Sequence, residues 1–407
     1  MSSTSPRKPR LALWFRYGPN EHARLFHALI PLLERLSARY EIHYWGMRSR
    51  EHPDEPDGMA AYAQVHFLPF SISRVDERDK TFKTLLWMLF LPWLALWSRL
   101  KGIRFVYMDE TIPLALPIAR LFFGNRVTLT VGDLFCEQYL QGEGLKGLLR
   151  RWVEAWDARA WRKAPFLITR SAAGPAFLAE RFGVEAENVF YAHDSVDFGL
   201  YAPAESLEVR EGLRRRMGWG PDDFVLVFHG LLNPAKDLDT PFEALPGILE
   251  KQPRFRLVLL GNGPEEARLR EKARKLGIEG AVEFRGYTLE TVVAEALAAA
   301  DAGLVARRPD DASHLVVTSV LGHCLAAGLP VVAARTAGVA RLVTHGETAM
   351  LYAPGDVADF QATVLRLVGS RELRADLARK GLQLARERLS VEEEVERNAE
   401  PFLTRWP

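Results

Sequence analysis

Short apolar segments alternate along most of the chain with longer segments whose apolar residues recur at helical spacing. In the first half, the segments predicted to be buried strands are 11–15, 40–47, 65–68, 104–108, 127–131, 166–169 and 189–191. Between the first two of these, residues 22–39 place Leu25, Leu29, Leu32, Leu33 and Leu36 on one helical face. Strands that alternate with such helices predict an α/β fold, with helices covering both faces of a parallel sheet.

The alternation stops near residue 200 and restarts near residue 222. The second set of predicted strands is 224–229, 256–260, 282–284, 302–306, 331–334 and 349–352. We therefore predict two doubly wound, Rossmann-like domains facing each other across a cleft, at 1–205 and 222–388, joined by a linker at 206–221. The last segment, 389–407, is predicted to be a helix that returns to the N-terminal domain.

Length, composition and charge exclude several classes of protein. The 407 residues suit two domains, and the formal net charge of +1 argues against a nucleic-acid binder. Two cysteines, Cys136 and Cys324, are too few for a disulfide framework or a cysteine-ligated zinc site, and they fit a reducing cytoplasm. The apolar stretch 11–15 is shorter than the roughly 7–15 apolar residues of a secretory signal, so no such signal is expected.

Two segments of the first domain predict helices that face a membrane, at 84–100 and 144–163. The first contains thirteen consecutive apolar residues, which is fewer than the roughly 20 that a spanning helix needs, and it has no polar face. The second combines a Leu and Trp stripe with many Arg and Lys residues, a pattern typical of an interfacial helix. Core helices or an oligomer interface are the alternatives. The first interpretation predicts a cytoplasmic protein that binds peripherally to the inner leaflet.

Several loops after the predicted strands of the second domain carry residues that suit an anion. Gly230 follows a strand and Lys236 follows six residues later, where the lysine can supply charge to a diphosphate. Thr318 or Ser319 can cap a helix whose free backbone N–H groups and dipole favour a diphosphate. Gly261, Gly263 and Gly286 fit either close contact with a ligand or simple turns, and a solvated surface lysine is the alternative for Lys236.

The order and spacing of these segments resemble the donor-binding domain of family 4 glycosyltransferases, which have the GT-B fold. The matching segments, spread over 224–356, are 228–230 with Lys236, 259–264, 282–286, 299–301, 325–332, 342–346 and 354–356. The first domain resembles the family more loosely, at 18–22 and 192–197.

The resemblance implies transfer of a sugar, with retention, from a UDP- or GDP-linked nucleotide-sugar to a sugar or lipid-linked glycan acceptor, in cell-envelope or exopolysaccharide synthesis. It implies neither a cofactor nor a metal. The residues expected to bind the donor are Gly18, Gly230, Lys236, Gly261, Gly263, Arg285, Gly286, Tyr287, Thr318, Ser319, Val320 and His323. The residues expected to act in catalysis are Lys236, His22 and Asp133, the last two by positioning the acceptor, although each also has a purely structural interpretation.

The sequence also departs from the family. The arginine that usually precedes the lysine is missing from 231–233, and the usual pair of glutamates is replaced by Leu315 and His323. His323 can accept a hydrogen bond from the ribose more weakly than a carboxylate. Arg307 or Arg308 could supply the missing positive charge, and Asp310 or Asp311 the first carboxylate. The alternative is an inactive paralogue that serves as a membrane-peripheral partner subunit; a nucleotide-sugar epimerase of the same overall fold fits the detailed match less well.

Overall fold

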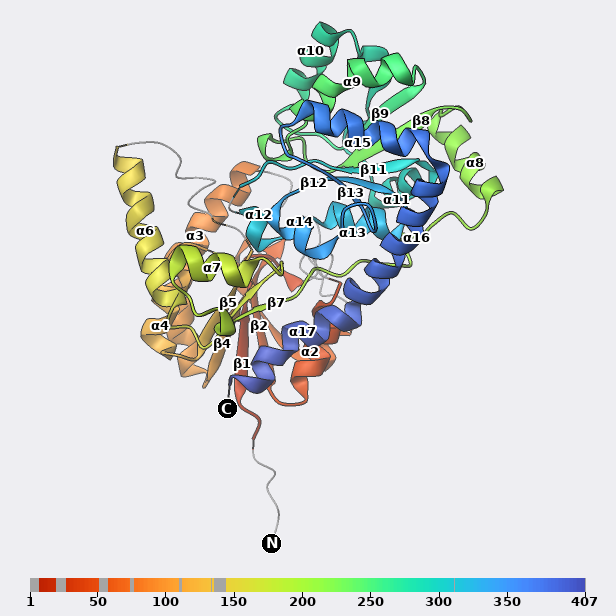
Figure 1. Cartoon of the computed structure of the whole chain (residues 1–407). Coiled ribbons are helices and arrows are strands. Elements are labelled where there is room, and N and C mark those ends of the chain that lie inside the picture. Colours follow the sequence, from red (N-terminus) through yellow and green to blue (C-terminus); the bar gives the residue numbers. More distant parts are fainter. Residues whose placement is uncertain are drawn as a thin grey trace. The chain divides into compact units, whose positions relative to one another are not determined.

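The computed structural model describes residues 7–19, 27–50, 58–73, 77–109, 112–132, 134, 144–310 and 312–406, with the backbone alone at 77–81. The chain divides into two compact units (Figure 1). The first unit comprises residues 1–195 together with 391–407, and the second comprises residues 196–390. The chain therefore passes from one unit to the other twice, at 195–196 and at 390–391.

The first unit is built on a seven-stranded parallel sheet, in the order β3-β2-β1-β4-β5-β6-β7. Its strands are β1 (Arg10–Trp14), β2 (Glu41–Ser49), β3 (Ala63–Ile72), β4 (Phe105–Met108), β5 (Val127–Val131), β6 (Leu167–Thr169) and β7 (Val189–Tyr191). The central strands are buried on both faces, as expected of apolar strands covered by helices on either side.

The helices of the first unit include the end of the chain. They are α2 (Leu29–Ser37), α3 (Glu77–Leu100), α4 (Ala115–Phe123), α6 (Leu145–Trp161), α7 (Gly174–Phe182) and α17 (Val391–Thr404), with short 3-10 turns at Met59–Ala61 and Ala186–Asn188. Helix α17 packs against α2, and the Tyr40 hydroxyl donates a hydrogen bond to the Phe402 carbonyl oxygen at 2.6 Å. The final helix thus completes the core of the first unit.

The second unit is built on a six-stranded parallel sheet, in the order β10-β9-β8-β11-β12-β13. Its strands are β8 (Phe224–His229), β9 (Phe255–Leu260), β10 (Val282–Phe284), β11 (Ala302–Val305), β12 (Val331–Ala334) and β13 (Met350–Tyr352). All thirteen strands of the two sheets lie where the apolar segments predicted them. The predicted pair of Rossmann-like parallel sheets is therefore confirmed.

The helices of the second unit cover both faces of this sheet. They are α8 (Leu207–Met217), α9 (Asp239–Lys251), α10 (Glu266–Leu276), α11 (Glu290–Ala299), α12 (Ala312–Leu315), α13 (Ser319–Ala326), α14 (Ala337–Leu342), α15 (Val357–Gly369) and α16 (Arg371–Arg388), with 3-10 turns at Pro234–Lys236 and Glu279–Ala281. Residues 206–221, expected to be a linker, instead contain α8, whose Leu213 and Met217 enter the core of this unit. A charged helix with few apolar residues looks like a linker in sequence, because its partners lie far along the chain.

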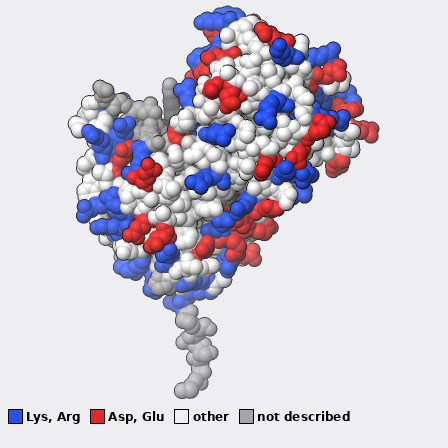
Figure 2. Space-filling model, in the orientation of Figure 1, with Lys and Arg blue, Asp and Glu red and all other residues white. Residues whose placement is uncertain are grey.

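Helices α3, α4 and α6 expose many large apolar side chains, which we call the apolar surface of the first unit. Helix α3 packs against α4, and α4 packs against α6. The exposed residues are Phe82, Leu85, Leu89, Trp93, Leu96 and Leu100 on α3, Leu121 on α4, and Leu145, Leu148, Leu149, Trp152 and Trp156 on α6. Lys and Arg side chains lie along the margin of the first unit where Figure 1 places α6 (Figure 2). Within the described part of the chain, no helix is both long and apolar enough to cross a membrane.

Candidate functional site

The sheet of the second unit has a switch point between β8 and β11. From β8 the chain adds β9 and β10 on one side of the sheet, and then β11, β12 and β13 on the other. The loops that leave the carboxyl ends of β8 and β11 therefore lead to opposite sides of the sheet, and open parallel sheets bind ligands at such a point. Lys236 follows β8, and both Arg307 and α13 follow β11.

Lys236 ends a short 3-10 turn and lies half-buried beside the switch point. No described residue accepts a hydrogen bond from its ammonium group or forms an ion pair with it. Burial, and next the Arg307 guanidinium, lower the pKa of Lys236 to about 8, while the Asp310 carboxylate opposes the shift. A partly desolvated cation that makes no ion pair with a described residue favours an anionic ligand.

The loop after β11 lies against the loop that carries Lys236. The backbone N–H of Arg308 donates to the Ala235 carbonyl oxygen at 2.9 Å. The Arg307 Nη2 atom lies 3.3 Å from Asp310 Oδ1. The Nε atom of Arg307 is buried and has no hydrogen-bond partner among the described residues. Arg308 instead faces outward, with Asp239 3.6 Å away.

Helix α13 begins with unsatisfied backbone donors, as the sequence predicted. Thr318 occupies the N-cap position, but its side chain makes no capping hydrogen bond. No described residue accepts a hydrogen bond from the backbone N–H of Ser319 or Val320. These donors and the helix dipole together favour an anion at this end of the helix.

The glycines predicted to meet the donor serve two different purposes. A Cβ on Gly261 would overlap the Gly230 carbonyl oxygen, and a Cβ on Gly263 would overlap the Leu232 carbonyl oxygen, so both are required for loops to pack together. Gly230 and Gly286 have φ of 126° and 66°, which favour glycine, and open space lies where their Cβ atoms would be.

The loop after β10 carries Arg285 and Tyr287, both predicted to touch the donor. The Arg285 guanidinium binds Glu283 and the Met217 carbonyl oxygen, so these partners hold it against α8. Tyr287 is 78% exposed, and no described residue forms a hydrogen bond with its side chain. Tyr287 therefore presents the more accessible side chain of this loop.

His323 lies in a stack of three rings. Its ring centroid is 4.0 Å from that of Tyr201 and 5.2 Å from that of His229, and both pairs are nearly parallel. Burial, together with nearby His323 and Lys236, lowers the pKa of His229 to about 3, so His229 is neutral near pH 7. Sequence reasoning missed Tyr201 and His229, although His229 directly precedes Gly230 at the end of a predicted strand. Leu315, at the position of the other usual glutamate, is fully buried.

The predicted residues of the first unit are only partly described. Gly18 lies against β2, where a Cβ would come within 2.9 Å of the Met47 carbonyl oxygen, so close packing explains this glycine. His22 and Asp133 lie outside the described residues. Their role in positioning an acceptor stays a prediction.

Part of the second unit, including this switch point, is similar to a known protein family. Residues 223–370, which contain Lys236, Arg307 and α13, match the family described as "Glycosyl transferases group 1". The match covers this segment of the chain, and we call the segment the group 1 domain after it. This confirms the predicted resemblance to glycosyltransferases over the second unit.

Curated relatives match more than half of the chain. The D-inositol 3-phosphate glycosyltransferase of Thermomonospora curvata is 30% identical over 232 residues, covering 54% of this chain and 52% of that protein. The lipopolysaccharide core biosynthesis glycosyltransferase LpsD of Rhizobium meliloti is 28% identical over 260 residues, covering 58% of this chain and 71% of that protein. The chain thus spans about half the length of the first of these relatives.

Solved structures extend the likeness to both units. Anabaena Alr3699/HepE in complex with UDP aligns with a TM-score of 0.71 at 17% identity, covering 97% of this chain and 100% of that one. Sucrose-phosphate synthase from Thermosynechococcus elongatus aligns with a TM-score of 0.72 at 16% identity, covering 98% of each chain. These alignments confirm the predicted GT-B fold.

Within the group 1 domain, the carboxylates next to Lys236 have protein partners. Asp239 binds Arg268 at 2.8 Å and Lys272 at 2.6 Å, and these hydrogen bonds lower its pKa to about 2. Asp237 accepts a hydrogen bond from the Thr240 hydroxyl. Among the described residues, no group of three or more His, Cys, Asp or Glu side chains could hold a metal ion.

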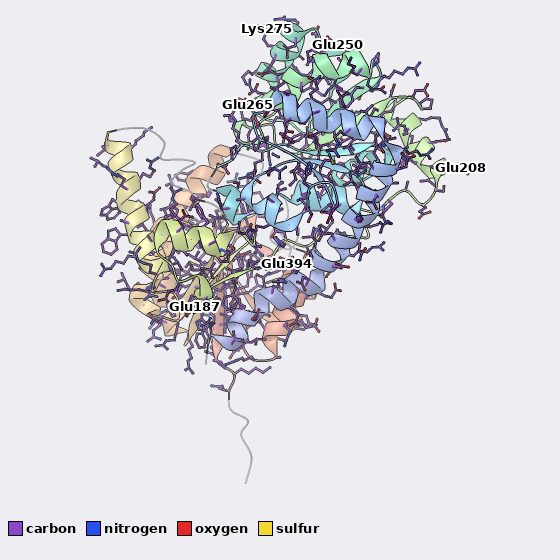
Figure 3. The ribbon with its side chains drawn as sticks, viewed as in Figure 1. Glu187, Glu208, Glu250, Glu265, Lys275 and Glu394 are labelled. Atoms are coloured by element: carbon purple, nitrogen blue, oxygen red, sulfur yellow. The ribbon has the colours of Figure 1, made fainter. Side chains whose placement is uncertain are left out.

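Outside the group 1 domain, the first unit has a buried charged cluster at the carboxyl ends of its strands. Arg170, which follows β6, lies 2.6 Å from Asp109, 3.2 Å from Glu394 and 3.4 Å from Asp194. Glu394, labelled in Figure 3, comes from α17 and also accepts a hydrogen bond from the Ser195 backbone N–H. Burial raises the pKa of Asp194 to about 7, although Arg170 favours its charged form. The sequence signal was weak, because Asp109 follows a predicted strand without a recognisable motif, and Asp194 lies in the segment 192–197, whose resemblance to the family is loose.

Proposed function

We propose that the chain is a glycosyltransferase that moves a sugar from a UDP- or GDP-linked donor to an acceptor. The observation that carries this proposal is the half-buried Lys236 ammonium group, which forms no ion pair with a described residue. It lies at the same switch point as the N–H groups of Ser319 and Val320, which have no acceptor among the described residues. Both suit a diphosphate. The names of the two curated relatives add support, since both are glycosyltransferases, and the Alr3699/HepE structure is in complex with UDP.

In the proposed reaction, the bond between the anomeric carbon and the diphosphate oxygen breaks, and the acceptor hydroxyl oxygen bonds to the same face of that carbon. The electron pair leaves with the diphosphate, whose growing charge Lys236 and the start of α13 stabilise. The proton of the acceptor passes to the leaving diphosphate oxygen. The configuration is retained, and no protein carboxylate need form a covalent intermediate.

The remaining donor contacts follow from the loops around the switch point. Gly230 and Gly286 leave open space beside the backbone, which suits close approach of the sugar or the base. The exposed Tyr287 ring can stack on a base, and His323 replaces the carboxylate that would accept from the ribose. We propose neither a cofactor nor a metal, and we propose that His22 and Asp133 position the acceptor.

Calorimetric titration with UDP, GDP and ADP tests the donor site. The parent protein should bind at least one of the three. Lys236→Ala should weaken that binding roughly 10- to 100-fold, which corresponds to the free energy that one hydrogen bond to a charged group contributes. Lys275→Ala removes an exposed lysine of the same domain, labelled in Figure 3, and should change nothing. If the parent binds none of the three, the inactive partner subunit becomes the better hypothesis.

We further propose that the apolar surface of the first unit binds the cytoplasmic face of a membrane, where a lipid-linked acceptor of cell-envelope or exopolysaccharide synthesis would be found. Leu89 is 79% exposed and Leu145 is 83% exposed, and water-facing side chains of this kind are costly over so large an area. The basic residues of α6, among them Arg151 and Arg159, are exposed beside the apolar stripe, which suits anionic lipid. The part that LpsD plays, by its name, in lipopolysaccharide core synthesis supports the same setting.

Sedimentation with phosphatidylcholine vesicles, with and without phosphatidylglycerol, tests this second proposal. The protein should pellet with the anionic vesicles, and less so at high salt because salt screens the basic residues. The double variant Leu89→Glu, Leu100→Glu should remain in the supernatant. The matched variant Leu207→Glu, Leu289→Glu changes two exposed leucines of the second unit and should pellet like the parent. Equal pelleting of both variants would refute membrane binding through this surface.

A further inference from the structure

We infer that Arg307 is the second cation that binds the diphosphate of the donor, in place of the arginine missing from 231–233. This inference rests on the proposed function. It selects Arg307 over its neighbour Arg308, although sequence alone could not separate the two.

Backbone geometry brings Arg307 next to Lys236. The two residues follow β8 and β11, which are adjacent strands on either side of the switch point. The hydrogen bond from the Arg308 N–H to the Ala235 carbonyl oxygen joins the residue after Arg307 to the residue before Lys236. Two cations from loops that are tied together in this way can contact one anion between them.

The surroundings of the Arg307 side chain suit an incoming anion. Its side chain is 14% exposed, and its described partner is Asp310, at 3.3 Å. The buried Nε atom has no acceptor among the described residues, which is costly for a guanidinium removed from water. A guanidinium presents its donors as a planar fork that matches two phosphate oxygens, so a diphosphate would satisfy the Nε donor as well.

Arg308 has the opposite character. Its side chain is 51% exposed and lies 3.6 Å from Asp239, and its backbone N–H donates the hydrogen bond to the Ala235 carbonyl oxygen. Water and a carboxylate already stabilise its charge. Arg308 therefore provides a matched control, one position away in sequence.

The charge balance around the switch point leads to the same conclusion. Lys236 and Arg307 are cationic, His229 is neutral near pH 7, and Asp310 is the one carboxylate that acts on Lys236 among the described groups. The pair thus carries an excess of positive charge in a partly desolvated place. A bound diphosphate would remove the repulsion between the two cations, whereas a nucleoside monophosphate would reach only part of the site.

Binding measurements on two variants test the inference. Arg307→Ala should weaken nucleoside diphosphate binding roughly 10- to 100-fold, with much less effect on the matching monophosphate. Arg307→Lys should recover part of the loss, and Arg308→Ala should bind like the parent. If Lys236→Ala loses binding but Arg307→Ala does not, the inference is wrong and the proposed function stands. If the parent binds no nucleoside diphosphate, both are wrong.

A second measurement does not depend on nucleotide. An NMR pH titration of the Lys236 side-chain resonance, assigned with Lys236→Arg, should give a higher pKa in Arg307→Ala than in the parent, because a neighbouring positive charge has been removed. Arg308→Ala should leave that pKa close to the value of the parent. An unchanged pKa in Arg307→Ala would place the guanidinium too far away to share a phosphate, and would overturn the inference.

Discussion

Asp157 is a buried carboxyl group whose effect on the free energy of unfolding can be measured. It lies on α6, is 7% exposed, and accepts a hydrogen bond at 3.0 Å from the backbone N–H of Leu114, at the start of α4. Burial is the largest cause that raises its pKa, to about 7, and the hydrogen bond from Leu114 opposes this only partly. The group is therefore protonated in the folded protein at pH values where it is ionised in the unfolded chain.

The sign and size of the effect follow from linkage. Below about pH 4 the carboxyl is protonated in both states and costs nothing. As the pH rises from about 4 to about 7, the unfolded state is favoured by ionisation, so the free energy of unfolding falls. Raising a carboxyl pKa from 3.8 to about 7 corresponds to a loss of about 4 kcal/mol above pH 7. Asp157→Asn keeps an acceptor for Leu114 and should remove this loss.

The assay is urea unfolding, followed by tryptophan fluorescence, at pH values of about 5, 6, 7 and 8. These values span the range in which the carboxyl group titrates. Of the ten tryptophans, all except Trp219 belong to the first unit, so fluorescence reports mainly on the unit that contains Asp157. Burial lowers the pKa of His66 to about 4, so His66 makes the free energy of unfolding rise with pH in the acid range. Because His66 is present in both proteins, its contribution cancels when the variant is compared with the parent. The reasoning fails if Asp157→Asn shows the same fall in stability with pH as the parent. Glu396→Gln, which removes an exposed carboxylate of the same unit that pairs with Arg35, is the control.

Two further substitutions test the packing of each unit. Arg170→Met should lower the free energy of unfolding of the first unit by about 3–5 kcal/mol, because it leaves Asp109 and Glu394 buried without their cation. Urea unfolding measures this loss, and a loss below about 1 kcal/mol would contradict the account of the cluster. Gly261→Ala should destabilise the second unit by more than about 3 kcal/mol, because φ at this position is 143° and the new Cβ atom would overlap Gly230. Circular dichroism during heating measures the change. Gly280→Ala is the control and should change little, because open space lies where its Cβ atom would be.

The sequence predicts the strands well and individual side-chain partners poorly. An apolar segment such as 224–229 specifies a buried strand by itself, because burial on both faces of a parallel sheet requires continuous apolar residues. Arg285 shows the limit: its position after β10 suggested a donor contact, but its guanidinium binds Met217, 68 residues away. The helix around Met217 was itself mistaken for a linker. A partner brought in from so far along the chain leaves no local signal.

For the same reason, the sequence cannot distinguish the role of Arg307 from that of Arg308. Both are arginines after one strand, and the sequence offers no reason to prefer either. The choice depends on which side chain lies inside the fold, and burial there follows from the contact between the loops after β8 and β11. A pattern of residues can therefore predict that a cation is needed at this switch point, but only the packing of the loops shows which residue meets the need.

The departures from the glycosyltransferase family share one physical constraint, the balance of charge at the switch point. A glutamate in place of the fully buried Leu315 would be an uncompensated buried charge here, since Asp310 already accompanies Arg307. A glutamate in place of His323 would lie between the rings of Tyr201 and His229, whose parallel stack offers it no donor on either face. On our inference, Arg307 from the loop after β11 takes the place of the missing arginine beside Lys236, so the number of cations at the switch point stays the same while the two carboxylates are absent. The expected net charge of the site is therefore more positive than the family pattern would give, which favours an anionic ligand.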